Sequence, residues 1–253
     1  GAKSTSSQDD DSTIVVNLAV AFCEGEVAHL GRIWADGQLL DTRNLTYRFH
    51  KGSSDQAPDS LIAAMQGSGN CPAYRGLCYI VFENLDIGQF GNRIPQISVE
   101  LCRPVGDLEQ NLRAVCVIPG STEFGYDPSP RVRLLGYGET KTENAHHVVG
   151  RSDWDVSIDE LTALCPNLKH VALVVSWFGN DLRCGQCEIA PRVIDHERQL
   201  KNVEWQVAGL ERNAAQVTSA NNGAPAYGGT PSDQSIIYAI DDVHARGIKV
   251  TLY

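Results

Sequence analysis

The stretch CPAYRGLCYIVFENLDIGQFGNRIPQISVEL, residues 71–101, decides the fold prediction for the first part of the chain. Residues 77–82 form a continuous apolar run, which predicts a buried strand. In residues 96–101 polar and apolar side chains alternate, which predicts a strand with one face in water. Residues 86–95 between them are rich in glycine and end at a proline, as loops often do. We therefore expect two strands joined by a loop.

The chain before this stretch also has the pattern of strands. The segment TIVVNLAVAF, residues 13–22, is apolar almost throughout, which predicts a strand buried on both faces. Asp36-Gly37 lies between two apolar dipeptides and is the strongest local sign of a β-hairpin. Residues 45–52 predict another short strand.

A short helix is expected between these strands and the first stretch. Pro58 and Asp59 are residues with which helices begin, and Gly67 is placed to end the helix. Leu61 and Met65 then share one helical face.

The middle of the chain combines strands with a helix. Strands are predicted within residues 112–120 and 170–179. Ser157 and Glu160 form a capping box that predicts a helix over 157–165. The fold class predicted for the whole chain is therefore α+β and β-rich, with mostly antiparallel strands and a few short helices.

The last fifty residues change character. A loop rich in glycine and proline leads to Thr230, which we expect to cap a helix with Pro231 as its first residue. Ile236, Ile240 and Val243 then form a helical stripe, and a strand follows in the last six residues. A helix followed by a strand is half of a βα repeat, so we expect this polypeptide to be one segment of a longer protein.

Composition narrows the class of protein. A chain of 253 residues is long enough for two ordinary domains, and 42% hydrophobic and 21% charged residues are typical of a soluble globular protein. Residues 1–12 are polar and acidic, without the apolar segment of a secretory signal, which predicts a flexible lead-in and synthesis in the cytoplasm. The formal net charge of -10 argues against general affinity for nucleic acid.

The cysteines offer the first candidate chemistry. Most of the eight lie within or beside apolar runs, which predicts mostly free thiols that pack as small hydrophobic groups. Cys184 and Cys187 have CxxC spacing, typical of zinc and redox sites. Because no second CxxC is present, a solvent-facing turn or a local disulfide is favoured over a metal or redox module, and no cofactor is expected.

Acidic side chains and a glycine-rich loop are the other candidates. Five carboxylates could supply the pair that glycosidases use: Asp153, Asp155, Asp159, Glu160 and Asp181. Asp159 and Glu160, however, fall in the first turn of the predicted helix, where negative side chains are stabilising in any case. The loop AYGGTPSD, residues 226–233, could hold a phosphate but has no lysine and no nucleotide-binding spacing. We expect no catalytic, cofactor-binding or metal-binding residue in this chain.

The order of the turn motifs resembles a known family. Trp-Ala-Asp-Gly at 34–37, Pro-Asp at 58–59, Pro-Ala-Tyr-Arg-Gly at 72–76 and Phe-Gly-Asn-Arg-Ile-Pro-Gln at 90–96 follow one another as in tail-hub domains of phage tail tip proteins. The resemblance is closer to the large baseplate hub protein ("megatron") of gene transfer agents. It continues to the last residues, where PAYGGTPSDQSIIYAIDDVHARGIKVTLY is similar to the opening of that family's TIM-barrel-like, glycoside-hydrolase-related domain.

The resemblance implies a domain organisation and a role. After the lead-in, residues 13–105 and 106–205 would be two hub domains, and 206–253 the start of the barrel domain. The family implies a structural virion protein at the tail tip or baseplate, assembled as a homotrimer that closes the tail tube. Its partners would be the distal tail protein and the fibres, DNA would pass through its channel during ejection, and the host envelope would be contacted indirectly.

Residues at the motif corners are the expected interface or structural positions. They are Trp34, Asp36, Gly37, Arg75, Gly91, Asn92, Arg93 and Pro95. The alternative left open is that these residues form the N-terminal modules of a peptidoglycan-cleaving glycoside hydrolase. One βα repeat cannot build the active site of a barrel enzyme, so this segment is expected to have no enzymatic activity.

Overall fold

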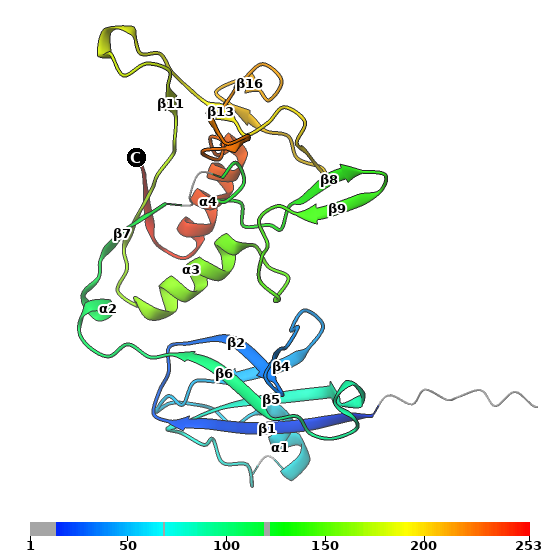
Figure 1. The fold of residues 1–253 in the computed structure, drawn as a ribbon. Coiled ribbons are helices and arrows are strands. Elements are labelled where there is room, and N and C mark those ends of the chain that lie inside the picture. The colour runs from blue at the N-terminus through cyan, green and yellow to red at the C-terminus, as the bar shows by residue number, and fades with distance from the viewer. Residues whose placement is uncertain (1–13, 68, 119–121) are drawn as a thin grey trace, which may run out of the picture. The chain divides into compact units, whose positions relative to one another are not determined.

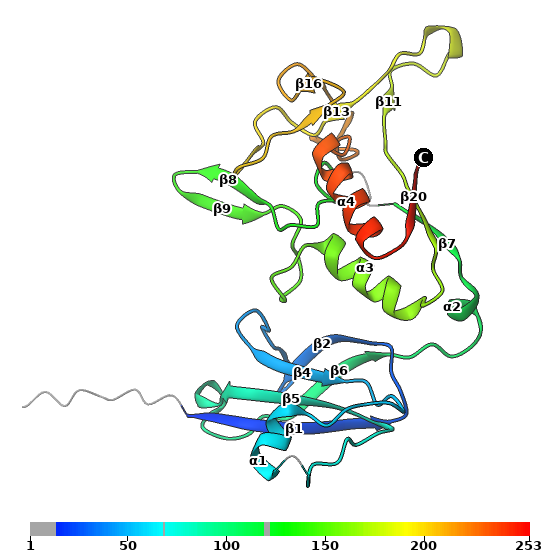
Figure 2. The same ribbon diagram turned by 180° about the vertical axis from the view of Figure 1, so that it is seen from behind.

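The computed structural model describes residues 14–67, 69–118 and 122–253, and the predicted lead-in of residues 1–12 lies outside them. The chain divides into two compact units, Gly1–Pro104 and Val105–Tyr253 (Figures 1 and 2). Among the described residues, unit 1 has one hydrophobic core cluster and unit 2 has two.

Unit 1 is built from strands with one short helix. Its elements are β1 (Val15–Glu24), β2 (His29–Ala35), β3 (Gln38–Leu39), β4 (Thr46–His50), α1 (Ser60–Gln66), β5 (Leu77–Asp86), the 3-10 helix η1 (Gly88–Phe90) and β6 (Ile97–Cys102). They form two antiparallel sheets of three strands each, in the orders β1-β5-β4 and β3-β2-β6. Side chains of both sheets, among them Ile33 and Phe82, meet in one core.

Several local predictions for unit 1 are confirmed. The hairpin turns at Asp36 and Gly37, whose φ values of 50° and 77° are those of a type I′ turn, and Trp34 faces Leu39 across it. Helix α1 is capped by Asp59 and ends at Gly67. Strand β5 is the central, largely buried strand of its sheet.

The prediction that residues 13–22 form a strand buried on both faces is wrong. Strand β1 lies at the edge of its sheet, and exposed and half-buried residues alternate along it. Val16, Leu18 and Val20 pack against the core, whereas the small Ala19 and Ala21 give the outward face its apolar character. An apolar run whose outward positions are small residues such as alanine therefore does not distinguish an edge strand from a central one.

Unit 2 has a parallel sheet, two longer helices and many short strands. Its elements are α2 (Leu108–Asn111), β7 (Ala114–Val117), β8 (Val132–Gly136), β9 (Glu139–Thr142), α3 (Asp153–Leu164), β10 (His170–Leu173), β11 (Phe178–Gly179), the 3-10 helix η2 (Cys184–Gln186), β12 (Ile189–Ala190), β13 (Arg192–Val193), β14 (Gln199–Leu200), β15 (Gln206–Val207), β16 (Leu210–Glu211), β17 (Gln216–Val217), β18 (Ala220–Asn221), β19 (Ala224–Pro225), α4 (Asp233–Ala245) and β20 (Lys249–Leu252).

The main sheet of unit 2 is parallel, in the order β20-β10-β7. Helices α3 and α4 contribute Trp154, Ile158, Ile236 and Val243 to the core that also contains Val171 of β10. The segment 206–253, predicted to begin a separate domain, thus supplies α4 and β20 to the same compact unit as β7 and β10. The described residues form no closed barrel, and the fold as a whole is β-rich α+β, as predicted.

Both helix starts predicted in this unit are wrong. Helix α3 is capped by Ser152, whose hydroxyl accepts a hydrogen bond from the Asp155 N–H, so Ser157 lies inside the helix. Helix α4 is capped by Ser232, because the Thr230 hydroxyl accepts a hydrogen bond from the Arg192 N–H instead. In both cases contacts with a distant segment decide which of two capping residues is used.

Candidate interaction surface

The tip of the β2–β3 hairpin and the loop before β6 form one corner of unit 1. The Asp36 carboxylate accepts hydrogen bonds from the Gln96 N–H at 2.9 Å and from the Arg93 guanidinium at 2.7 and 3.3 Å. The Asp36 N–H in turn donates to the Gln96 carbonyl at 2.9 Å. We call Asp36, Arg93 and Gln96 the motif corner, because they join two of the motifs that carry the family resemblance.

Hydrogen bonds keep the carboxylate of the motif corner ionised. The Gln96 N–H and, after it, the Arg93 guanidinium hold the pKa of Asp36 below its usual range. Arg93 is 62% exposed, so its ion pair is screened by water and contributes little to stability. The pair therefore serves to fix the position of the loop rather than to hold unit 1 folded.

The backbone of the loop explains the other predicted residues of this region. Gly91 and Asn92 have φ values of 70° and 59°, and consecutive left-handed residues of this kind reverse the chain. The Asn92 N–H donates to the Ile87 carbonyl at 3.1 Å, and Pro95 is buried. These residues set the path of the loop, and Arg93 lies where that path brings it to Asp36.

Apolar side chains accompany the motif corner. Ile94 is 56% exposed, and Leu39, which lies opposite Trp34 across the hairpin, is 45% exposed. The Arg32 guanidinium lies 5.2 Å from the centre of the Trp34 ring and pairs with Glu100 at 2.9 Å. Exposed apolar groups within a polar rim have the composition of protein–protein contact surfaces.

Arg75, the other predicted arginine, is bound within its own chain. Its Nε donates to the Gln56 carbonyl at 3.3 Å. The Gln56 amide is buried and donates to the Ala73 and Tyr74 carbonyls at 3.0 and 2.9 Å, so it holds the PAYRG turn from inside. Gln56 is not predicted from the sequence, because a glutamine in a loop carries no local sign of burial.

A second missed feature is the cluster around Asp59. This carboxylate is buried and accepts hydrogen bonds from Arg48 and His50 at 2.8 and 2.9 Å, in addition to the α1 N–H groups it caps. Burial opposes the charge, but bonds from Arg48, His50 and the Ile62 N–H more than offset it and lower the pKa of Asp59. Asp59 therefore links the helix to strand β4.

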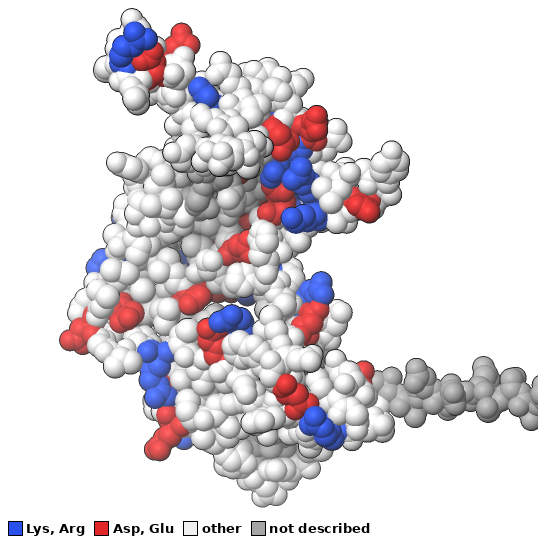
Figure 3. Space-filling view, viewed as in Figure 1, with Lys and Arg blue, Asp and Glu red and all other residues white. Residues whose placement is uncertain are grey.

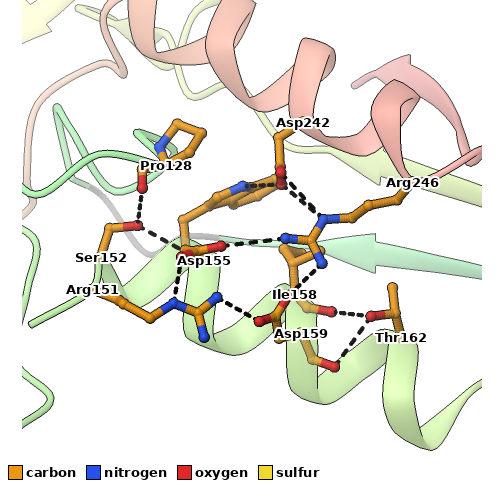
Figure 4. A network of polar contacts seen from close by, with 10 residues as sticks. Pro128, Arg151, Ser152, Asp155, Ile158, Asp159, Thr162, Asp242 and Arg246 are labelled. Atoms are coloured by element: carbon orange, nitrogen blue, oxygen red, sulfur yellow. Dashed lines mark hydrogen bonds and ion pairs between the residues drawn. The ribbon is translucent and has the colours of Figure 1, made fainter. Parts of the chain in front are cut away.

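The acidic candidates of unit 2 belong to a network between α3 and α4 (Figure 4). Arg246 at the end of α4 binds Asp159 at 2.5 Å and Asp155 at 3.3 Å, and Arg151 binds the same two carboxylates at 2.5 and 2.6 Å. Burial opposes ionisation of Asp159, but Arg246 and then Arg151 lower its pKa. A carboxyl group held ionised in this way is unsuited to act as a general acid near neutral pH.

Trp154 extends this network to the second helix. Its indole N–H donates to Asp242 of α4 at 2.9 Å, while its ring packs in the core. Of the five acidic candidates, Asp155 and Asp159 are brought together and Asp153 lies in the first turn of α3, where its carboxylate binds His146 at 2.6 Å. Asp181 pairs with Arg183 in an exposed loop. The prediction that Asp159 and Glu160 lie in the first turn of the helix is wrong, because α3 begins at Asp153 and places both inside the helix.

The remaining motifs do not form ligand sites in the described part of the chain. Cys184 is exposed and Cys187 half-buried, and no disulfide joins the two. Among the described residues we find no group of three metal-ligating side chains. The AYGGTPSD loop packs on the buried Glu123, so closely that a Cβ on Gly229 would lie 2.5 Å from its carboxylate, and a carboxylate in that place disfavours phosphate.

Charge and hydropathy of the surface add two observations. On the face shown in Figure 3, basic and acidic side chains are interspersed, without a continuous basic stripe. None of the described helices combines the length and the apolar character required to cross a bilayer.

Comparison with solved structures gives a partial match. A chain of a solved structure described as "Virion of native gene transfer agent (GTA) particle" is 42% identical, with a TM-score of 0.36, over 38% of this chain and 22% of that chain. The chain thus spans about a fifth of the length of that virion protein, and a TM-score of this size does not establish a shared fold. No protein-family model and no curated protein matches the chain.

Proposed function

We propose that this chain is a structural virion protein of a phage or gene transfer agent, and that it acts as a hub at the tail tip or baseplate. The observation that carries the proposal is the motif corner. Two motifs that are far apart in the sequence converge on Asp36 and fix an exposed loop, with Ile94 and Leu39 beside it. A rigid exposed corner with apolar side chains suits contact with another chain.

The finer parts of the proposal follow the family resemblance. The chain would assemble as a homotrimer, contact the distal tail protein and the fibres, and surround a channel for DNA during ejection. Arg75 and Arg93 bind groups of their own chain, so they would act by positioning loops that neighbouring chains contact. We further propose that this chain supplies no catalytic group, and that Asp155 and Asp159 join α3 to α4 through Arg246.

Localisation in assembled particles tests the role directly. The full-length protein with an epitope tag would be expressed in the producing bacterium, and purified particles would be examined by immunogold electron microscopy. Gold at the tail tip is the expected result. Particles without label, or label on the head, would refute the proposal.

A matched pair of variants tests the motif corner. Arg93→Ala removes the bond to Asp36, whereas Arg43→Ala removes an exposed pair with Asp41 that lies within one local turn. We expect Arg93→Ala to lower incorporation into particles at least about threefold and Arg43→Ala to leave it unchanged, because only the first removes a bond between the loop beside Ile94 and the hairpin. Equal incorporation of both folded variants would contradict a role for the corner.

Cross-linking of particles tests the homotrimer and should yield a product with three copies of the chain. A strict monomer would exclude the homotrimer.

A further inference from the structure

Cys23 of β1 and Cys78 of β5 lie directly opposite each other in the antiparallel pairing of these strands. Directly opposed residues in such a pair have Cα atoms about 4.5–5.5 Å apart and point to the same face. This separation falls within the range of about 4.4–6.8 Å found for disulfides. The pair follows a register shift between Ala21 and Cys23, and the pairing brings the two thiols within the reach of a disulfide.

The two thiols differ in access. Cys23 is half-buried, whereas Cys78 is fully buried, and burial followed by the nearby Cys23 raises the pKa of Cys78 to about 12. An incoming oxidant therefore meets Cys23 first, and Cys78 is held behind it as a protonated thiol.

A cation lies beside the accessible thiol. The Arg103 Nη2 donates to the Cys23 sulfur at 3.5 Å and to the Glu24 and Gly25 carbonyls at 2.7 and 3.1 Å, while its Nε donates to the Glu26 carbonyl at 2.9 Å. These carbonyl bonds fix the guanidinium in place. The guanidinium therefore faces the sulfur that would attack an incoming disulfide.

We infer that Cys23 and Cys78 form an oxidation site, at which a small-molecule disulfide such as glutathione disulfide converts the two thiols into a cross-strand disulfide. The Cys23 thiolate attacks one glutathione sulfur and releases the first glutathione as its thiolate. Cys78 then gives its proton to water, attacks the Cys23 sulfur and releases the second glutathione as its thiolate. The two released thiolates take up the two protons that Cys23 and Cys78 have lost. Two protein thiols are oxidised, and one glutathione disulfide is reduced to two glutathione molecules.

The cross-link would close a loop that contains β2, β3, β4 and α1. Closing a loop of this length restricts the unfolded chain and stabilises the folded one. For a unit of this size we expect the midpoint of thermal unfolding of unit 1 to rise by about 4 °C or more. The inference concerns unit 1 alone and does not rest on the proposed function.

Disulfide mapping of the folded whole chain tests the inference. The chain would be incubated with glutathione disulfide, quenched in acid, denatured, alkylated with iodoacetamide and digested with trypsin. Cleavage after lysine and arginine places Cys23 in peptide 4–32 and Cys78 in peptide 76–93, so their cross-link has a unique mass. We expect this cross-linked peptide from the wild type and equally from the Cys184→Ser/Cys187→Ser variant, whose changes lie in an exposed loop.

Two further variants separate this reaction from nonspecific oxidation. In Cys23→Ser the cross-link is lost and Cys78 is recovered alkylated. Arg103→Gln, checked for folding by circular dichroism, should form the cross-link about 3- to 10-fold more slowly, because negative charge on the attacking sulfur no longer faces a cation. Alkylation of both Cys23 and Cys78 in the oxidised wild type, a persistent glutathione adduct on Cys23, or pairing of Cys23 with Cys102 would overturn the inference.

Discussion

Replacement of Asp59 is the most informative test of what holds unit 1 together. Its side chain is buried, and it accepts hydrogen bonds from the Leu61 and Ile62 N–H groups as well as from Arg48 and His50. Asp59→Ala removes all of them. Asp59→Asn keeps an oxygen that can cap α1 but removes the charge that Arg48 and His50 face.

The magnitude follows from these contacts. Loss of a helix cap costs about 1 kcal/mol. Removing one partner of a buried ion pair costs about 3–5 kcal/mol, but Arg48 is 30% exposed and retains Glu83 at 2.8 Å, so we expect about 1–3 kcal/mol from this source. Asp59→Ala should thus lower the free energy of unfolding of unit 1 by about 2–4 kcal/mol, and Asp59→Asn by about 1 kcal/mol less.

Hydrogen exchange of the whole chain in increasing urea, followed in peptides from β5, measures this loss in unit 1 separately from unit 2. Asp41→Ala serves as the control, because its pair with Arg43 is exposed, and it should leave exchange unchanged. A loss below about 1 kcal/mol for Asp59→Ala, or equal effects of Asp59→Ala and Asp41→Ala, would refute the reasoning.

The same residue predicts a pH dependence. Because folding lowers the pKa of Asp59, its contribution is fully present above the unfolded pKa of about 3.9 and is lost as the pH falls through the folded pKa. The difference between wild type and Asp59→Ala should therefore be constant from pH 7 to 5 and shrink below about pH 4. A difference that grows on acidification would contradict this assignment.

Two further predictions concern unit 2. Arg246→Met removes the cation bound to Asp242 and one of the two bound to Asp155 and Asp159, which keep Arg151. We expect it to cost about 1–3 kcal/mol, measured by urea-dependent exchange in α3 peptides, whereas the exposed Arg183→Met should have no effect. Equal exchange in both variants would contradict the network's role. Gly229→Ala places a Cβ 2.5 Å from the Glu123 carboxylate and 2.9 Å from the Arg192 carbonyl. It should therefore lower the free energy of unfolding, followed by exchange in α4 peptides, by about 1–3 kcal/mol. Gly185→Ala, which meets no atom within 4 Å, should cause no change, and a neutral Gly229→Ala would show that the loop can move away.

Elements whose signals are local could be predicted from the sequence. The hairpin at Asp36-Gly37 and the cap at Asp59 depend on residues within a few positions, and both are confirmed. The predicted starts of α3 and α4 were wrong because contacts with distant segments select the capping residue. Ser152 and Ser157 are both possible caps for α3, and the burial of Trp154 together with the bond from Ser152 to the Pro128 carbonyl favours the first.

Long-range contacts could not be predicted from local patterns. Arg93 and Asp36 are 57 positions apart, and Arg246 and Asp159 are 87 apart. The local sequence around each residue therefore does not identify its partner. The parallel pairing of β20 with β10 likewise depends on how the chain returns, which the spacing of apolar residues does not specify. Motifs in the sequence could therefore mark Asp36 and Arg93 as candidates, but not that the two bind each other.

The binding of Arg93 to its own chain sharpens the interface proposal. If Arg93 bound a neighbouring chain directly, Arg93→Lys would retain much of its charge-based attraction, whereas positioning of the Asp36 carboxylate depends on the two guanidinium nitrogens that contact it. We therefore expect Arg93→Lys to lower particle incorporation nearly as much as Arg93→Ala, at unchanged stability of the isolated chain. Incorporation at the wild-type level for Arg93→Lys would instead place the arginine in direct contact with its neighbour, where a positive charge alone suffices.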